Sequence, residues 1–203
     1  IQGYIETALL QAEAGGDHAA LATHLRVSIR QCRRLSQLIE ELFELSRLQS
    51  DTTQPDPEPF SLLELAHDCV QEFQLKANQK AIQLAVRGEP HDSLVTADIA
   101  MIQRVLQNLL DNALRHTETG GSVSLQISRV ANGTRISVSD TGCGISHHDI
   151  PFIFDRYFQA RGTTRNGSHG LGLAIVQRIL ELHQTRIEVE SELNRGTRFS
   201  FVL

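Results

Sequence analysis

Apolar side chains recur at steps of three and four through the first fifty residues, which is the spacing of amphipathic helices. The pattern predicts a helix over Ile1–Ala14, stopped by Gly15-Gly16, and a longer helix from Asp17 to about Gln49. Two helices joined by a short glycine turn form an antiparallel hairpin whose single apolar stripe needs a partner, so we expect a homodimer through this hairpin. The positions of the stripe are Leu21, Leu25, Ile29, Cys32, Leu35, Leu38, Ile39, Leu42, Leu45 and Leu48.

The stretch Asp51–Pro59 (DTTQPDPEP) holds three of the five prolines and no large apolar residue. This composition predicts a linker between a hairpin domain at 1–50 and a second domain at 60–203. Strands interleaved with helices in the second domain favour an α+β sandwich, a mixed sheet with helices on one face. The expected helices are 62–75, 99–116 and 170–183, and the expected strands are 82–87, 122–129, 135–139, 187–190 and 198–203.

Composition excludes some classes of protein. The net charge of −5 argues against a general nucleic-acid binder, which usually carries a basic surplus. Three widely spaced cysteines without a C-x-x-C pair (Cys32, Cys69 and Cys143) fit a reducing compartment. No apolar run approaches the roughly 18 residues of a membrane span. The chain begins at Ile1 and its only methionine is Met101, so we expect a fragment whose membrane anchor, if any, lies upstream.

Asn108, Asn112 and Arg115 lie at i, i+4 and i+7, on one face of the helix predicted at 99–116. An amide oxygen can bind Mg²⁺, a hard cation that also keeps waters and phosphate oxygens, and Arg115 supplies a fixed charge for phosphate. The alternative is an ordinary solvated helix face.

Asp140 closes a predicted strand and is followed by Gly142 and Gly144. A carboxylate at a strand end can accept a hydrogen bond from an exocyclic amine, which would distinguish adenine from guanine. The glycines let the backbone pass close to a flat ring. The alternative is a plain turn after a strand, where Asp, Thr and Gly are common.

Gly170-Leu-Gly172 opens a predicted helix, and the free N–H groups of a helix start suit a polyphosphate. The alternative is a loop that meets a helix.

The segment Gln159–His169 is polar and follows the aromatic anchors Phe152, Phe154 and Phe158, so we expect a mobile lid, or else a satellite hydrophobic cluster under a loop. His147-His148-Asp149 follows Ser146 in a capping-box pattern, which favours a helix cap over a metal site.

With these motifs the chain resembles the sensor histidine kinases of two-component signalling over essentially its whole length. Asn108–Thr117 (NLLDNALRHT) resembles the family's asparagine box, and DTGCGI and HGLGLAIV resemble its two glycine boxes. FDRYFQ resembles its phenylalanine box, and LIEELFELSRL the second helix of its dimerisation and phosphotransfer hairpin.

The resemblance implies roles for single residues. Asn112 would bind Mg²⁺, with Asn108 beside it near the phosphates. Arg115, where the family usually has Lys, would contact phosphate, and His116, where Tyr is common, would lie near the ribose or adenine. Asp140 would bind the adenine amine. The other implied ATP-binding residues are Gly142, Gly144, Ile145, Tyr157, Gly170, Leu171, Gly172 and Leu173.

The sequence also departs from the family. Ser168 replaces a glycine that is common in the last box. The phosphoacceptor histidine would lie roughly nine residues before Ile1 by motif spacing. Neither His18 nor His24 has the acceptor pattern, so no catalytic residue of that kind is expected within the chain.

The implied function is the catalytic core of a histidine kinase with ATP and Mg²⁺ as cofactors. It would pass the γ-phosphate to a histidine and then to an aspartate on a response regulator receiver domain. The chain would be the cytoplasmic portion of an inner-membrane sensor protein. Two alternatives stay open: an ATP-binding module without kinase activity, and another ATPase of the same fold group (the GHKL type). Those ATPases usually carry a water-activating Glu where Asn108 stands.

Overall fold

The computed structural model describes residues 18–50, 52–89, 93–159 and 170–203, together with Gly3, Ile5 and Thr7. The chain forms two compact units, residues 1–44 and 45–203. Within the described ranges no helix is long and apolar enough to cross a membrane.

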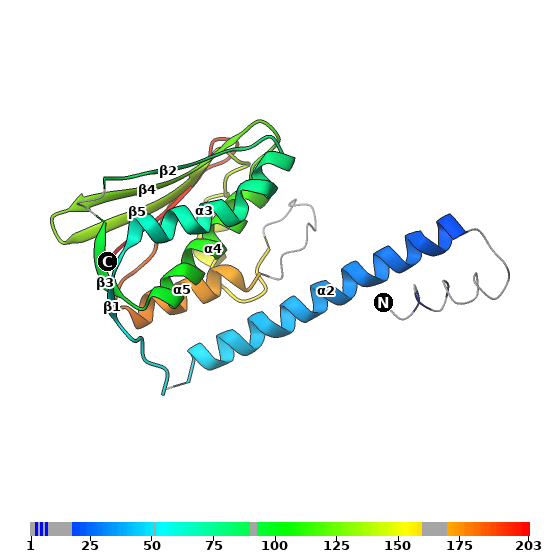
Figure 1. The fold of residues 1–203 in the computed structure, drawn as a ribbon, viewed down its shortest axis with the longest axis horizontal. Helices are drawn as coiled ribbons and strands as arrows, with labels where there is room; N and C mark the ends of the chain where they lie inside the picture. Colours follow the sequence, from blue (N-terminus) through cyan, green and yellow to red (C-terminus); the bar gives the residue numbers. More distant parts are fainter. Residues whose placement is uncertain are drawn as a thin grey trace. The chain divides into compact units, whose positions relative to one another are not determined.

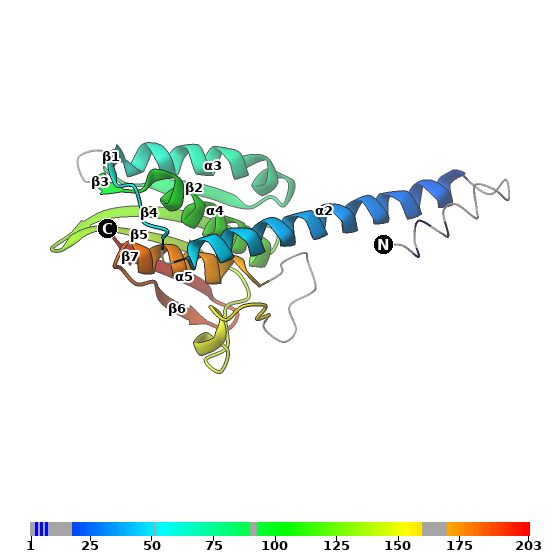
Figure 2. The same ribbon diagram turned by 90° about the horizontal axis from the view of Figure 1, so that it is seen from below.

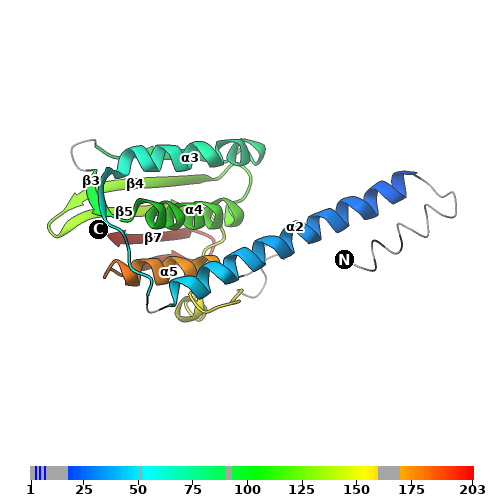
Figure 3. The ribbon, with the colours of Figure 1, turned by 60° about the horizontal axis from the view of Figure 1, so that its bottom comes forward.

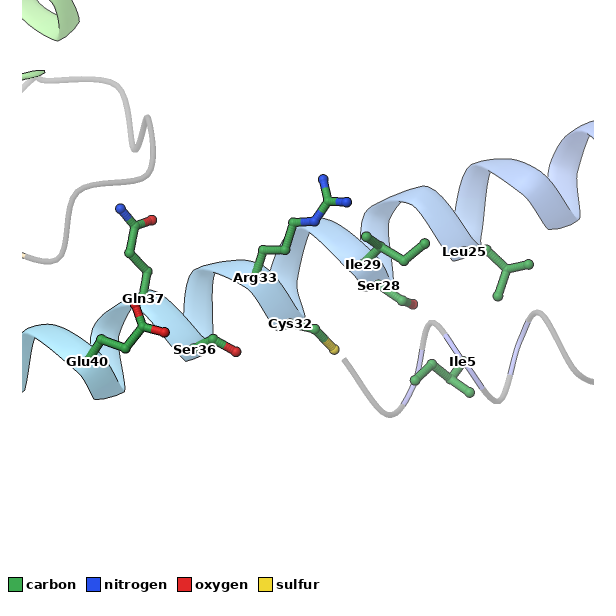
Figure 4. Close-up of a pocket in the computed structure, with 9 residues that line it drawn as sticks. All are labelled: Ile5, Leu25, Ser28, Ile29, Cys32, Arg33, Ser36, Gln37 and Glu40. Carbon is green, nitrogen blue, oxygen red and sulfur yellow. The ribbon is translucent and has the colours of Figure 1, made fainter. Parts of the chain in front are cut away.

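The smaller unit contains α2 (His18–Leu48) as far as Glu44, and the last four residues of the helix belong to the larger unit. The bounds of α2 are within one residue of the helix predicted from Asp17 to about Gln49. The predicted first helix lies mostly outside the described residues, although Gly3, Ile5 and Thr7 are helical. Ile5 and three residues of the apolar stripe line a groove along α2, as Figure 4 shows. Six large apolar side chains along α2 are exposed: Leu25, Ile29, Leu35, Ile39, Leu42 and Phe43.

The larger unit contains a five-stranded sheet in the order β2-β4-β5-β7-β6. The pair β2–β4 is parallel and the other three pairs are antiparallel, so the sheet is mixed as predicted. The turn at Asn132-Gly133 joins β4 to β5. The strands are β2 (Gln83–Arg87), β4 (Ser122–Val130), β5 (Gly133–Asp140), β6 (Glu188–Glu192) and β7 (Gly196–Val202).

Three helices cover one face of this sheet, α3 (Leu62–Gln79), α4 (Ile99–His116) and α5 (Gly172–Leu182) (Figures 1, 2 and 3). The central helix, α4, begins at Asp98, whose side chain accepts the N–H of Met101 and caps the first turn. The predicted α+β architecture with helices on one face is confirmed. The buried face of α4 consists of Ile102, Val105, Leu106, Leu109, Leu110, Ala113 and Leu114.

A second, two-stranded sheet was not predicted. β1 (Glu58–Ser61) pairs antiparallel with β3 (Leu94–Ala97), and Pro59 lies opposite Thr96. Thus the last residues of the stretch expected as linker, Asp51–Pro59, belong to a strand. Proline is tolerated there because a two-stranded sheet has only edge strands.

The last turn of α2 also differs from expectation. Leu45 and Leu48 were predicted in the apolar stripe of the hairpin, but both are buried at 2% exposure in the core of the larger unit. The carbonyl of Leu48 accepts a hydrogen bond of 3.0 Å from Nε of Arg178 on α5. Helical periodicity alone does not distinguish these two leucines from the exposed ones, because both sets keep the same spacing.

Candidate functional site

The asparagine motif (Asn108 and Asn112) meets the Gly170–Gly172 motif between α4 and the start of α5. A side chain built on Gly172, the first residue of α5, would lie 3.4 Å from Oδ1 of Asn108. Nδ2 of Asn108 is buried and has no hydrogen-bond partner among the described residues. A buried amide usually has a partner, so this group marks a place where a ligand could complete its hydrogen bonds. Asn112 lies one helical turn further along the same face.

The helix that carries the asparagine motif meets the Asp140–Gly144 motif where α4 ends. The N–H of Cys143 donates to the carbonyl of His116 at 3.3 Å. A Cβ at Gly142 would lie 2.4 Å from that same carbonyl oxygen, a distance that no side chain could occupy. Gly142 is therefore required by close packing of the loop on α4. The two glycine motifs thus contact α4 at different levels, the Gly172 segment at Asn108 and the Gly142 segment at His116, so the three motifs lie along the C-terminal half of α4.

Asp140 lies at the end of β5, in the centre of the sheet. Its Oδ1 accepts the N–H of Gly142 at 2.8 Å, and its carboxylate also accepts the N–H of Thr197. Burial raises the pKa of Asp140, while these two N–H groups oppose the rise. The carboxylate is thus held in a fixed orientation and partly removed from water, which suits recognition of an amine.

The loop after Asp140 is held by the turn between β6 and β7. The N–H of Ile145 donates to Oγ of Ser191 at 2.8 Å, and that hydroxyl also bonds the carbonyl of Gly196 and Oγ1 of Thr197. Gly144 has φ +68°, and a Cβ there would lie 2.0 Å from the Glu192 carbonyl. Ser191 and Thr197 were missed by the sequence analysis. At this turn the sequence signal is Gly196, the first residue of β7.

The start of α5 is tied to the segment that precedes the expected lid. The N–H of Tyr157 donates to the carbonyl of Gly170 at 2.9 Å, and both residues have positive φ, 64° and 71°. A Cβ at Gly170 would lie 2.6 Å from the Phe158 carbonyl, so glycine is required at this contact. The expected lid lies almost wholly in residues 160–169, outside the described residues. Leu171 is fully buried and Leu173 packs against the core, so both support the start of α5.

Arg115 and His116 end α4 in different surroundings. Nη2 of Arg115 donates to Oδ2 of Asp111, which also pairs with Lys76 of α3. The pKa of His116 is lowered by burial and by the nearby Arg115 and Lys80, so the imidazole is favoured in its neutral form. A neutral imidazole can both donate and accept a hydrogen bond, as contact with a hydroxyl requires.

The donor set suits a magnesium ion that arrives with a nucleotide. Among the described residues no group of three or more His, Cys, Asp and Glu side chains could hold a metal, and this includes His147-His148-Asp149. Asn112 offers a neutral amide oxygen to the ion, and the unpartnered Nδ2 of Asn108, one turn earlier, could donate to a phosphate oxygen of the nucleotide that carries the ion. Mg²⁺ is commonly bound by one or two protein oxygens together with phosphate oxygens and waters, so these residues fit it.

Comparisons with known proteins agree with this geometry. Residues 97–203, which include all three motifs, match the family "Histidine kinase-, DNA gyrase B-, and HSP90-like ATPase". The sensor histidine kinase RppB of Synechocystis sp. is 34% identical over 89% of this chain and 40% of its own length. The chain likewise spans 33% of the sensor-like histidine kinase ycf26 of Pyropia yezoensis, so it covers less than half of these relatives.

Two solved structures extend the comparison. Full-length ShkA in complex with AMPPNP has a TM-score of 0.75 and 27% identity, over 86% of this chain and 37% of that protein. The histidine kinase ThkA in complex with the response regulator TrrA has a TM-score of 0.78 over 98% of this chain and 55% of that one; at 23% identity it shows the fold alone. The chain therefore belongs to the histidine kinase-, DNA gyrase B-, and HSP90-like ATPase family, as a sensor histidine kinase catalytic domain.

Proposed function

We propose that the site between α4, the loop after β5 and the start of α5 binds ATP with Mg²⁺ and presents the γ-phosphate to a histidine. The buried, unpartnered Asn108 amide carries this proposal, because a phosphate oxygen is the acceptor that its N–H groups lack. The Asp140 carboxylate supports adenine as the base, with Gly142, Gly144 and Ile145 along its edge.

Different residues would bind different parts of the nucleotide. Asn112 would hold Mg²⁺, which when bound neutralises phosphate charge and orients the phosphate chain. Asn108 beside it would donate to a phosphate oxygen. Gly170–Leu173 place the N–H groups of the α5 start against the phosphates, where the helix dipole also favours negative charge. His116 would bond the ribose or adenine. Tyr157 would border the site from the segment just before the expected lid, Gln159–His169. Transfer then needs positioning and charge neutralisation more than covalent chemistry by the protein.

We further propose the domain arrangement and partners of this chain. Residues 1–50 form the dimerisation and phosphotransfer hairpin, 51–59 the connection, and 60–203 the ATP-binding domain. The exposed apolar side chains of α2 support homodimerisation through the hairpin. The phosphate acceptor after the histidine is an aspartate of a response regulator receiver domain. The domain works as the cytoplasmic portion of a membrane-bound sensor.

A label-transfer experiment tests the proposed function. The 203-residue chain is incubated with γ-labelled ATP, alone or with a longer copy that carries the complete first helix and the Asn112→Asp change. We expect no label on the chain alone, label on the longer copy, and passage of that label to a receiver domain. Release of free phosphate without a labelled protein would contradict the proposal and indicate a hydrolytic ATPase instead.

A further inference from the structure

A line of three charged side chains joins α3 to the end of α4. Lys76, in the last turn of α3, pairs with Oδ1 of Asp111, and Arg115 donates to Oδ2 of the same carboxylate. We propose that Lys76 and Asp111 are positioning residues that set Arg115 toward the phosphates of the bound nucleotide. This inference rests on the proposed function. Lys76 lies outside the motifs that the sequence analysis assigned to the site, and Asp111 lies within Asn108–Thr117 but was given no role there.

The line becomes more buried as it approaches Arg115. The exposed fraction of the side chain is 44% for Lys76, 30% for Asp111 and 20% for Arg115. Each oxygen of the Asp111 carboxylate faces one cation: Oδ1 pairs with the Lys76 ammonium, and Oδ2 pairs with the Arg115 guanidinium.

An ionised Asp111 alone would have two opposing effects on a triphosphate. It orders the long Arg115 side chain in advance, which reduces the entropy lost when phosphate binds. It also places a negative charge beside the triphosphate and competes with it for the guanidinium. Lys76 offsets that charge, because two cations and one anion leave the line with one net positive charge. Lys76 thus lets Asp111 hold Arg115 without repelling the nucleotide.

The last turn of α3 is itself fixed. Nζ of Lys76 lies 5.9 Å from the centre of the Phe73 ring. Nζ of Lys80, one turn later, donates to the carbonyls of Leu114 at 2.7 Å and of Arg115 at 3.4 Å. The end of α3 therefore supports both the backbone and the side chain of Arg115.

Calorimetry with ATP and adenosine tests the inference, because only ATP carries the phosphates. We expect Lys76→Met to weaken ATP binding about three- to tenfold and to change adenosine binding less than about twofold. In the Asp111→Asn background, Lys76→Met should change ATP binding less than about twofold, because its route to Arg115 is already removed. Glu72→Ala is the matched control, since Glu72 bonds Gln107 across the same two helices one turn away. It should leave both affinities unchanged.

Three results would overturn the inference while wild-type ATP binding stands. The first is an equal loss of ATP and adenosine binding in Lys76→Met, which indicates a structural role. The second is a Lys76→Met effect on ATP binding that is as large in the Asp111→Asn background as in the wild type, which indicates long-range charge. The third is no effect of Lys76→Met on ATP binding. Lys76→Gln, which keeps a polar end, repeats the test if the methionine variant melts early. Failure of the wild-type chain to bind ATP would instead remove the proposed function, and the inference with it.

Discussion

Replacing Asp140 by Asn should weaken ATP binding about tenfold or more, since a hydrogen bond to a charged group contributes about 1.5–3 kcal/mol. The change preserves the shape of the side chain and an oxygen that can accept the Gly142 N–H. It removes the charge and one of the acceptors that would face the exocyclic amine. Calorimetry on the two proteins measures the difference, and Asp68→Asn, an exposed carboxylate on α3, is the control. Equal ATP affinity of wild-type and Asp140→Asn would contradict the role of Asp140.

We also expect the ATP affinity of the wild-type protein to depend on the protonation of Asp140. Because burial raises the pKa of Asp140, its charge should be lost on acidification at a higher pH than for an ordinary carboxyl. Wild-type affinity for ATP should therefore fall as the pH is lowered toward that raised pKa, and approach the affinity of Asp140→Asn. The variant has no carboxyl there, so it corrects for titration of the nucleotide itself. A ratio of affinities that does not change with pH would argue against a titrating carboxylate at the base.

Replacing Asn112 by Ala should abolish the magnesium dependence of ATP binding. Asn112 is half-buried and does not belong to the buried face of α4, so truncation leaves that face intact. Loss of a metal ligand or its supporting groups typically costs about 10- to 100-fold in metal affinity. ATP affinity of the variant should be the same with and without Mg²⁺. Gln107→Ala, on the same helix but bonded to Glu72, should keep the wild-type dependence. Retained dependence in Asn112→Ala would place the ion elsewhere.

Elements with strong local signals were predicted well. The sequence pattern predicts α4 at its observed bounds, because its apolar residues keep one helical face and Asp98 caps its start. The strands β1 and β3 were missed, since each has four residues and its pairing partner lies far along the chain. Leu45 and Leu48 were assigned to the apolar stripe because burial in another unit leaves no mark on spacing.

In the candidate site too, residues within sequence motifs were predicted and residues that act through tertiary contacts were not. The motif residues Asn108, Gly142 and Gly172 were found from sequence, and the structure places their three segments along the C-terminal half of α4. Lys76 and Ser191 were not found, because each acts across a tertiary contact to a residue more than thirty positions away, in pairs 35 and 46 positions apart. Polar residues on exposed helix faces and strands are common, so their sequence context alone does not mark them as supports of a site.

The most direct measurement is a calorimetric titration of the 203-residue chain with ATP and with GTP, each in the presence and absence of Mg²⁺. If Asp140 binds the exocyclic amine and Asn112 binds the ion, ATP should bind about tenfold tighter than GTP or better, and Mg²⁺ should strengthen ATP binding. Equal affinity for the two nucleotides, or ATP affinity that does not change with Mg²⁺, would contradict an adenine-specific Mg-ATP site between α4, the loop after β5 and the start of α5.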